Sequence, residues 1–281
     1  MRKSLSAIAL SLVFALNPSY AQQADAAQTA THEASSSMAE KQDMSSESMG
    51  AKETAVVSEE VRELFHSLEK NSFPPSAIAT MSLASFKGEK ESKSLSMEFF
   101  AKGDNVLIEI LSPRVDKGKY ILKSSEDLWM YFSKINRSIR IAARDSFMGT
   151  DANNYDLLEL NLVDDYDIVS HTDEMLDGKP VIRAELRARP DTEGYSRIVS
   201  YIDPINKTII RNDCFAISDT MIKSIAYFDH QMVGDYKVPM KTTIQNHLEK
   251  GRHSVMTFDS VNASDDIEEF MFSLGYLESL E

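Results

Sequence analysis

Short runs of hydrophobic and β-branched residues, separated by turn-forming residues, follow one another along most of the chain. Each run is rich in Ile, Val, Thr, Tyr and Phe and ends near Gly, Pro, Asn or Asp, which is typical of strands joined by turns. The runs are residues 94–100, 105–111, 119–123, 127–132, 197–202, 207–215, 221–228, 237–248 and 253–261. Because no helical segments alternate with them, the pattern predicts a mainly β (α+β) protein with a meandering antiparallel sheet of about ten strands.

Alternation within the runs indicates how the sheet faces its surroundings. In residues 221–228, Ile222, Ala226 and Phe228 fall on one side of the strand together with Ser224, while the other side mixes apolar and charged residues. Such a mixture predicts a curved sheet with one largely apolar face and a half-polar outer face.

One amphipathic helix is predicted before the strands, over Ser58–Lys70. Ser58 suits the N-cap position, and two glutamates follow it at the positive end of the helix. The apolar residues that share one helical face are Val61, Leu64, Phe65 and Leu68. A single helix is too small to cover so wide a sheet. We therefore expect further cover from other helical segments, such as residues 157–166, or from a ligand.

The first residues have the plan of a cleaved secretory signal. A basic start, a short apolar run and small residues at Ser19 and Ala21 predict a signal peptide over residues 1–21. The apolar run is shorter than the roughly 20 residues that a membrane helix needs, and no Cys follows it to carry a lipid anchor. Residues 22–57 have low complexity and no aromatic residue, so they predict a disordered linker. The expected folded domain of this exported, soluble protein is 58–281.

Composition narrows the class of protein further. The net charge is −14, and loss of Arg2 and Lys3 with the signal makes the mature chain more acidic. A nucleic acid would be repelled, and no Lys/Arg-rich stripe in the sequence offsets this charge. Cys214 has no second cysteine for an internal disulfide, so we expect a small buried residue there rather than a thiol that pairs between chains.

The sequence contains none of the common motifs for catalysis, metal binding or phosphate binding. There is no G-x-S-x-G elbow, no HExxH, no CxxC and no glycine-rich phosphate loop. The six histidines never take the spacing of metal ligands. We therefore expect a protein that is not an enzyme and that needs neither a cofactor nor a metal.

One polar segment, RDSFMGTDANNYDLLEL at Arg144–Leu160, allows either chemistry or architecture. Asp145 and Asp151 could form a hydrolytic pair, although no nucleophile or base accompanies them. Alternatively, Gly149 supplies a backbone position open to positive φ, and Asp151 accepts backbone N–H bonds in the following turn. Three nearby arginines are available to pair with such acids: Arg137, Arg140 and Arg144. Architecture is favoured because buried polar groups are satisfied as a rule, and the hydrolase stays a weaker alternative.

The run from Ser112 to Leu160 resembles the signature of the outer-membrane lipoprotein-sorting proteins, the LolA-like superfamily, in the branch often found beside resistance-nodulation-division exporters. The matching positions are Pro113, Lys117, Gly118, Trp129, Tyr131, Arg137, Arg140, Gly149, Thr150, Asp151, Tyr155, Asp156 and Leu157. Later segments follow the same pattern, at 178–186, 195–203, 238–248 and 265–273. The chain departs from it in YFSKINR, which lacks the usual Pro, and in the compressed Tyr155-Asp156-Leu157. The resemblance covers residues 58–278.

The resemblance implies a periplasmic protein whose sheet curls into an incomplete β-barrel, with helices on the concave side. A groove between sheet and helices would take the acyl chains of a lipoprotein or lipid. The residues expected to line it are Phe99, Ile108, Ile110, Trp129, Tyr131, Ile139, Ile141, Phe147 and Met148, with the Ser58–Lys70 helix as part of a lid. The motif residues expected to be structural are Gly118, Arg137, Arg140, Gly149, Asp151, Tyr155 and Asp156. An alternative function is that of a non-catalytic accessory that docks on a resistance-nodulation-division exporter.

Overall fold

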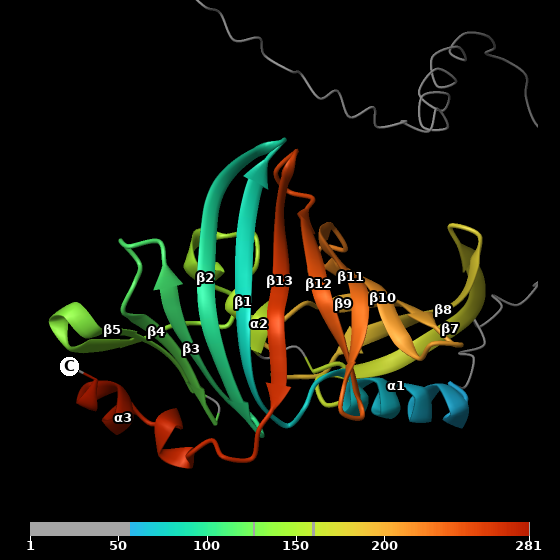
Figure 1. The fold of residues 1–281 in the computed structure, drawn as a ribbon. Helices are drawn as coiled ribbons and strands as arrows, with labels where there is room; N and C mark the ends of the chain where they lie inside the picture. The colour runs from blue at the N-terminus through green and yellow to red at the C-terminus, as the bar shows by residue number, and fades with distance from the viewer. Residues whose placement is uncertain (1–56, 126, 159–160, 281) are drawn as a thin grey trace, which may run out of the picture. The chain divides into compact units, whose positions relative to one another are not determined.

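One antiparallel sheet dominates the computed structural model, which describes residues 57–125, 127–158 and 161–280. Within these residues the sheet has 13 strands in the order β6-β5-β4-β3-β2-β1-β13-β12-β11-β10-β9-β8-β7 (Figure 1). The strands are β1 (Ser76–Lys87), β2 (Lys90–Lys102), β3 (Asn105–Ser112), β4 (Lys119–Ser124), β5 (Asp127–Phe132), β6 (Arg137–Arg140), β7 (Tyr166–Leu176), β8 (Lys179–Ala188), β9 (Arg197–Asp203), β10 (Thr208–Phe215), β11 (Met221–Val233), β12 (Tyr236–Asn246) and β13 (Arg252–Ala263). The predicted curved antiparallel sheet is confirmed.

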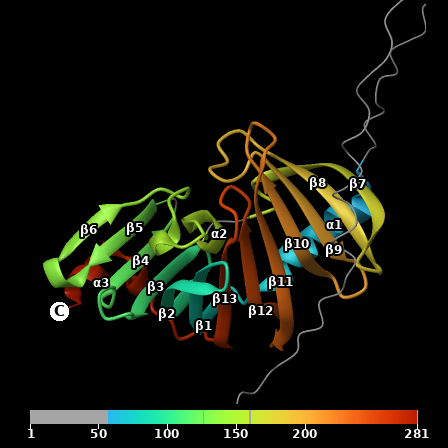
Figure 2. The ribbon, with the colours of Figure 1, turned by 90° about the horizontal axis from the view of Figure 1, so that it is seen from above.

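Consecutive strands along the chain pair with each other, except β6 and β7, which lie at opposite edges; a further pairing forms at the centre of the sheet. There β1 pairs with β13, with Ala77 opposite Ala263 and Lys87 opposite Arg252. This pairing joins the first and last strands of the chain, so a single sheet results. Figures 1 and 2 show β1 and β13 side by side in its middle.

The strand prediction missed β1, β6, β7 and β8, and β1 and β7 show the reason. Strand β1 alternates strictly between buried and half-buried positions, but many of them carry Ala or Ser, which are poor indicators of a strand from composition alone. Strand β7 is an edge strand and carries His171, Asp173 and Glu174, so its pattern is polar on both faces. In both cases pairing with a neighbouring strand, rather than residue preference, determines the structure.

Helix α1 (Glu59–Ser72) forms as predicted. The Ser58 side chain accepts a hydrogen bond from the Val61 backbone N–H at 3.4 Å, and Val61, Phe65 and Leu68 are buried. The helix packs against β10 and β12 and crosses that half of the sheet (Figures 1 and 2). Val57, which ends the predicted linker, is also buried in the core. The predicted signal peptide and residues 22–56 of the linker lie outside the described residues.

The predicted helical cover at 157–166 is wrong over most of its described part. Helix α2 spans only Asn154–Leu158, residues 159–160 lie outside the described part of the chain, and residues 161–165 form a turn. The Asn161 side chain accepts hydrogen bonds from the backbone N–H groups of Val163 (3.1 Å) and Asp164 (2.8 Å). Such local bonds compete with helical hydrogen bonding.

The core lies on both faces of the sheet. The inner face packs against α1 and the 141–163 region, whereas part of the outer face packs against η4 (Glu269–Phe272) and α3 (Leu274–Ser279). Strand β3 serves both sides, since Ile108 points into the inner cluster and Leu107 into the outer one. No helix of the described residues has the length and apolar character needed to cross a bilayer.

Candidate functional site

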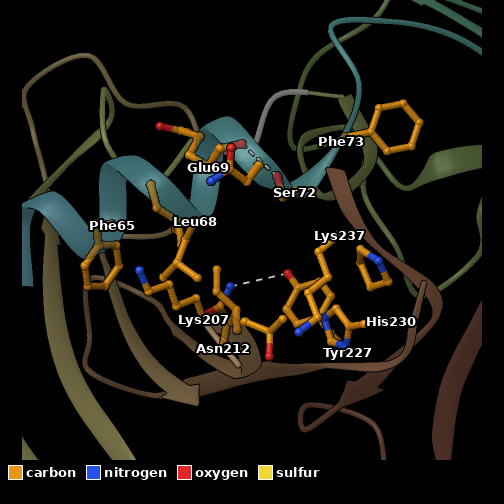
Figure 3. Close-up of a pocket in the computed structure, with 15 residues that line it drawn as sticks. Phe65, Leu68, Glu69, Ser72, Phe73, Lys207, Asn212, Tyr227, His230 and Lys237 are labelled. Atoms are coloured by element: carbon orange, nitrogen blue, oxygen red, sulfur yellow. Dashed lines mark hydrogen bonds between the residues drawn. The ribbon is translucent and has the colours of Figure 1, made fainter. Parts of the chain in front are cut away.

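A cavity of about 220 Å³ lies between helix α1 and strands β10 to β12 (Figure 3). Helix α1 and the residue that follows it contribute Phe65, Leu68 and Phe73, and the sheet contributes Ile209 and Pro239. The remaining lining residues are Glu69, Asn71, Ser72, Leu162, Lys207, Thr208, Asn212, Tyr227, His230 and Lys237. The cavity is therefore lined by both apolar and polar side chains on the helix side and on the sheet floor.

The polar groups of the floor are hydrogen-bonded to one another. Asn212 Nδ2 donates to the Tyr227 hydroxyl at 3.3 Å, a contact drawn in Figure 3. Ser200 Oγ donates to Asn212 Oδ1 at 2.7 Å. Burial raises the pKa of Tyr227, which keeps this phenol neutral. Asn212 and Tyr227 are thus already paired, which lowers the cost of covering this part of the floor with an apolar group.

Cationic and titratable side chains of the sheet surround the floor. Lys207, His230 and Lys237 all line the cavity, and Lys237 Nζ donates to the Asn206 carbonyl at 3.0 Å. Desolvation, followed by the charge of Lys237, lowers the pKa of His230 and favours its neutral form. The two lysines are thus the positive charges on this side of the cavity, and they could face the acidic end of an amphiphile.

Glu69 is the acidic group on the helix side. Burial, followed by the nearby charge of Asp164 and more weakly that of Asp165, raises its pKa from 4.5 to about 7. The raised pKa extends the pH range over which the protonated form of Glu69 is present.

The residues predicted to line a groove lie elsewhere, and none of these nine described residues lines the cavity under α1. Phe99, Ile108, Ile110, Phe147 and Met148 are buried in the inner core, and Ile141 packs against that core. Trp129 and Tyr131 belong to the outer cluster beside α3, on the opposite face, and Ile139 is 38% exposed. Alternation along β3 and β5 produces this division.

Sequence reasoning missed the cavity residues because most of them are polar. Lys207, Asn212, His230 and Lys237 look like surface residues in a strand pattern. The available signal was the apolar face of the predicted helix, which identified Phe65 and Leu68 as residues that must pack on something.

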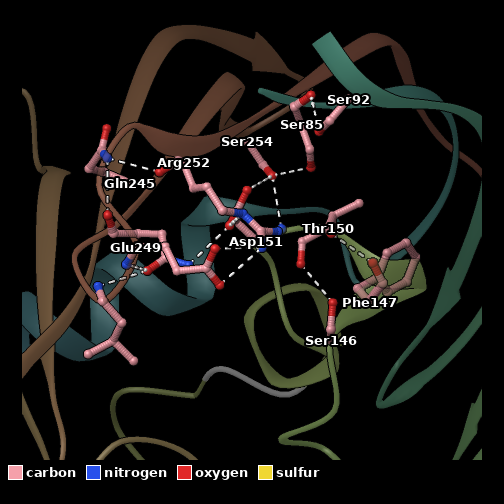
Figure 4. Close-up of polar contacts among 12 residues, drawn as sticks. Ser85, Ser92, Ser146, Phe147, Thr150, Asp151, Gln245, Glu249, Arg252 and Ser254 are labelled. Atoms are coloured by element: carbon pink, nitrogen blue, oxygen red, sulfur yellow. Dashed lines mark hydrogen bonds and ion pairs between the residues drawn. The ribbon is translucent and has the colours of Figure 1, made fainter. Parts of the chain in front are cut away.

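The Gly149-Thr150-Asp151 motif forms a loop fixed to strands β12 and β13 (Figure 4). The Asp151 carboxylate is 1% exposed and lies 3.0 Å from Arg252 Nε. It also accepts from Asn246 Nδ2 at 3.1 Å and from Ser254 Oγ at 3.3 Å. The Asp151 backbone N–H donates to Ser254 Oγ at 3.1 Å. The arrangement is architectural, with every Asp151 contact directed to the sheet.

The arginine that pairs with Asp151 was predicted wrongly. Arg252 fills this role, not Arg137, Arg140 or Arg144. Arg140 pairs with Asp127 on the neighbouring strand, Arg144 Nε donates to the Glu193 carbonyl at 2.9 Å, and Arg137 is exposed. The pairing joins residues about 100 positions apart (151 and 252), which local spacing does not reveal.

Two glycines of the motif occupy positions with positive φ. Gly149 has φ of 78°, as predicted, and Gly118 has φ of 83°. A Cβ on Gly118 would lie 2.5 Å from Ser133 Oγ, so a side chain is excluded there by space as well. Thr150 Oγ1 donates to the Phe147 carbonyl at 2.7 Å and closes the turn around Gly149.

Tyr155 and Asp156 take part in a second buried polar network. Asp156, 1% exposed, pairs with Lys223 at 2.7 Å and accepts from the Tyr195 hydroxyl. The Tyr155 hydroxyl donates to Asp165 Oδ2 at 2.7 Å. Cys214 is fully buried nearby, and burial together with Asp156 raises its pKa, so its thiol stays protonated. The predicted burial of Cys214 is confirmed. Within the residues described, no group of His, Cys, Asp and Glu side chains could hold a metal ion.

Comparison with known proteins identifies the fold. A family model described as that of an uncharacterized protein matches residues 102–279, more than half of the chain. No curated protein matches the sequence. Three solved structures share the fold. A DUF1329 family protein from Desulfovibrio piger has a TM-score of 0.70 and 19% identity over 77% of this chain and 97% of that protein.

The other two structures bear lipoprotein-sorting names. A putative outer membrane lipoprotein-sorting protein domain from Vibrio parahaemolyticus has a TM-score of 0.68 and 19% identity over 77% of this chain and 97% of that one. A LolA superfamily protein from Nitrosomonas europaea has a TM-score of 0.69 and 18% identity over 76% and 98%, respectively. The chain therefore belongs to the family of uncharacterized proteins whose model it matches, and its fold is that of the LolA-like superfamily.

Proposed function

We propose that this protein is a carrier that binds the acyl chain of a lipid or lipoprotein in the cavity beneath α1. The observation that carries the proposal is the cavity itself, with Phe65, Leu68 and Phe73 on one side and, on the sheet floor, Asn212 and Tyr227 hydrogen-bonded to each other. Burial of an acyl chain contributes about 0.8 kcal/mol for each CH₂ group and needs few directed bonds. The proposal includes no catalytic step.

The cavity size indicates that α1 moves when cargo binds. Its volume of about 220 Å³ is below the roughly 300–1,000 Å³ of most small-molecule sites. Helix α1 rests on the sheet through one apolar face, so a shift of the helix would enlarge the cavity without breaking strand pairing. Helix α1 is thus a lid in this proposal, as the sequence predicted for residues 58–70.

The proposed place of action is the periplasm, in outer-membrane lipoprotein sorting or in lipid transport. The predicted signal peptide at 1–21 supports export. Two of the similar structures carry lipoprotein-sorting or LolA names, and at below 25% identity they support the proposal through the fold alone.

Cargo analysis of a cavity-filled variant tests the proposal. Protein purified from the periplasm is examined by native mass spectrometry, and its lipids are extracted and identified. We expect bound acyl chains in the unaltered protein and their loss in Ile209→Trp, which fills the cavity. Ile217→Trp is the matched control, because Ile217 is 95% exposed and lies outside the cavity.

Two results would contradict the carrier function. One is a protein that is always purified empty, even when acyl lipids are supplied. The other is equal loading of the two tryptophan variants, provided that both unfold at the temperature of the unaltered protein. An empty protein that is captured together with a resistance-nodulation-division exporter would favour the accessory function instead.

A further inference from the structure

Two exposed aliphatic side chains and five exposed cations belong to β6 and to the turns near this edge of the sheet, whose backbone is shown in Figure 2. Val115, in the β3–β4 turn, is 73% exposed, and Ile135, in η2 (Ser133–Ile135), is 66% exposed. The two segments are neighbours, because the Ser133 backbone N–H donates to the Gly118 carbonyl at 3.0 Å. The exposed cations of these segments and of β6 are Arg114, Lys117, Lys134, Arg137 and Arg140. We call these seven residues the basic edge patch.

Within the described residues of 113–140, the acidic side chains are Asp116 and Asp127, and they do not cancel the charge of the patch cations. Asp116 is buried and already pairs with Lys119 at 2.6 Å and Lys93 at 3.7 Å, neither of which belongs to the patch. Asp127 pairs with one patch cation, Arg140, and the side chains of Asp127 and Arg140 are both largely exposed. The patch is therefore positive on a chain whose net charge is −14. Its cations are spaced singly over residues 114–140, so the sequence shows no basic run.

Protection of an open sheet edge explains only part of this surface. Charged side chains on a short edge strand prevent pairing with other chains, and Arg137 and Arg140 of β6 fit that role. Arg114, Lys117 and Lys134 lie outside the strand, and edge protection gives no reason to expose Val115 or Ile135. Exposed aliphatic residues surrounded by cations are typical of a surface that contacts the interface of a membrane.

We propose that the basic edge patch docks on an anionic phospholipid bilayer. The five cations complement the lipid phosphates, and Val115 and Ile135 enter the interfacial layer between headgroups. An acidic protein partner would also attract the cations, but it would not require two isolated aliphatic residues on adjoining turns.

The patch is separate from the cavity under α1. Strands β2, β1 and β13 lie between β3 and β12 in the sheet order, so docking at β6 leaves α1 uncovered. A carrier could in this way hold its lid away from the bilayer surface while it is bound there. The inference does not depend on acyl cargo, because it rests on different residues.

Vesicle sedimentation tests the patch. The protein, purified after export, is mixed with vesicles of equimolar phosphatidylcholine and phosphatidylglycerol, or of phosphatidylcholine alone. We expect binding to the mixed vesicles only, with an affinity that falls as salt is added. Each lipid-facing cation contributes about fivefold to the partition coefficient, so Lys134→Gln/Arg137→Gln is expected to bind about 25-fold more weakly.

Matched variants separate the patch from overall charge. Lys90→Gln/Lys250→Gln removes the same charge from exposed positions elsewhere, at the start of β2 and in the β12–β13 turn, and is expected to bind like the unaltered protein. Ile135→Ser is expected to weaken binding to mixed vesicles about tenfold while leaving the folded structure intact, since this side chain is 66% exposed. Acyl cargo measured in the same samples is expected to stay unchanged in every variant.

Several outcomes would overturn the inference. Equal binding to neutral and mixed vesicles, or none to either, removes the electrostatic contact with lipid. Equal losses in the patch and control double variants show that net charge, not this surface, controls binding. Binding of an acidic protein that depends on Lys134 and Arg137, without binding to vesicles, assigns the patch to a protein partner. If the protein binds vesicles but carries no acyl cargo, the result contradicts the carrier function and leaves the docking of the patch on lipid supported.

Discussion

At the scale of single residues, buried acids are held by partners that lie far away in the sequence. Asp151 links its loop to β12 and β13, and Asp156 links α2 to Lys223 on β11. The sequence predicted an architectural role for Asp151 from the turn chemistry around Gly149. It did not predict Arg252, because only strand pairing brings that residue near the loop.

Replacement of Asp151 by Ala is expected to destabilise the protein by about 2–4 kcal/mol, because Arg252 and Ser254 lose a buried partner. Urea unfolding measures the change. Asp127→Ala is the matched control, because the Asp127–Arg140 pair is exposed and contributes under about 1 kcal/mol. Similar losses in the two variants would show that burial of the Asp151 pair has no special importance.

Glu69 should make stability depend on pH. Its pKa rises from 4.5 in the unfolded chain to about 7 in the folded protein, so the folded state binds the proton more tightly. This contribution is complete below the unfolded pKa and is lost as pH rises through the folded pKa. Complete burial would make such a shift worth about 3 kcal/mol, and partial exposure of Glu69 reduces the expected loss to about 1–2 kcal/mol.

Glu69→Gln is therefore expected to flatten the fall in unfolding free energy between about pH 5 and about pH 8. Urea unfolding at a series of pH values provides the measurement. Glu63→Gln, on the exposed face of the same helix, removes an equal charge and should retain the fall. A slope that Glu69→Gln leaves unchanged would assign the pH dependence to other groups.

At the scale of elements, the sequence predicted those helices and strands that have a clear hydrophobic pattern and clear end signals. Helix α1 was predicted well because a cap, a charged first turn and an apolar face all agree. Nine strands rich in Ile, Val and aromatic residues were found, whereas β1, β6, β7 and β8 were missed, because many of their residues are small, polar or charged. The short helices η4 and α3, which cover the outer cluster, have too few residues for a periodic signal.

The N-cap of α1 should control how often the lid opens. Ser58→Ala removes the side-chain bond to the Val61 N–H and is expected to destabilise the helix by about 1 kcal/mol. Hydrogen exchange of α1 amides should then be about fivefold faster, with exchange in β1 and β13 unchanged.

Ser72→Ala provides the control at the other end of α1. Ser72 Oγ donates to the Glu69 carbonyl at 2.9 Å at an exposed position, so its loss should alter exchange little. Equal acceleration in both variants, or acceleration throughout the sheet, would contradict separate opening of the lid.

At the scale of the whole described part, one sheet carries two surfaces with different chemistry. The β10–β12 half holds the apolar cavity under α1, and the β6 edge holds exposed cations with two aliphatic residues. Predicted groove residues from β2, β3 and β5 instead fill the two cores that keep the sheet rigid. The proposed cargo site therefore lies in the β10–β12 half of the sheet. The groove residues that the LolA-like resemblance implied on β2, β3 and β5 lie in the other half.

The sequence by itself determined the strand-rich class, the amphipathic helix and the turn at Gly149, because these depend on short-range periodicity and backbone freedom. Only the tertiary structure decided that β1 pairs with β13, that Arg252 pairs with Asp151 and that the cavity lies over β10–β12. The physical reason is that each of these contacts joins residues distant along the chain. Their proximity arises from the register and curvature of the whole sheet.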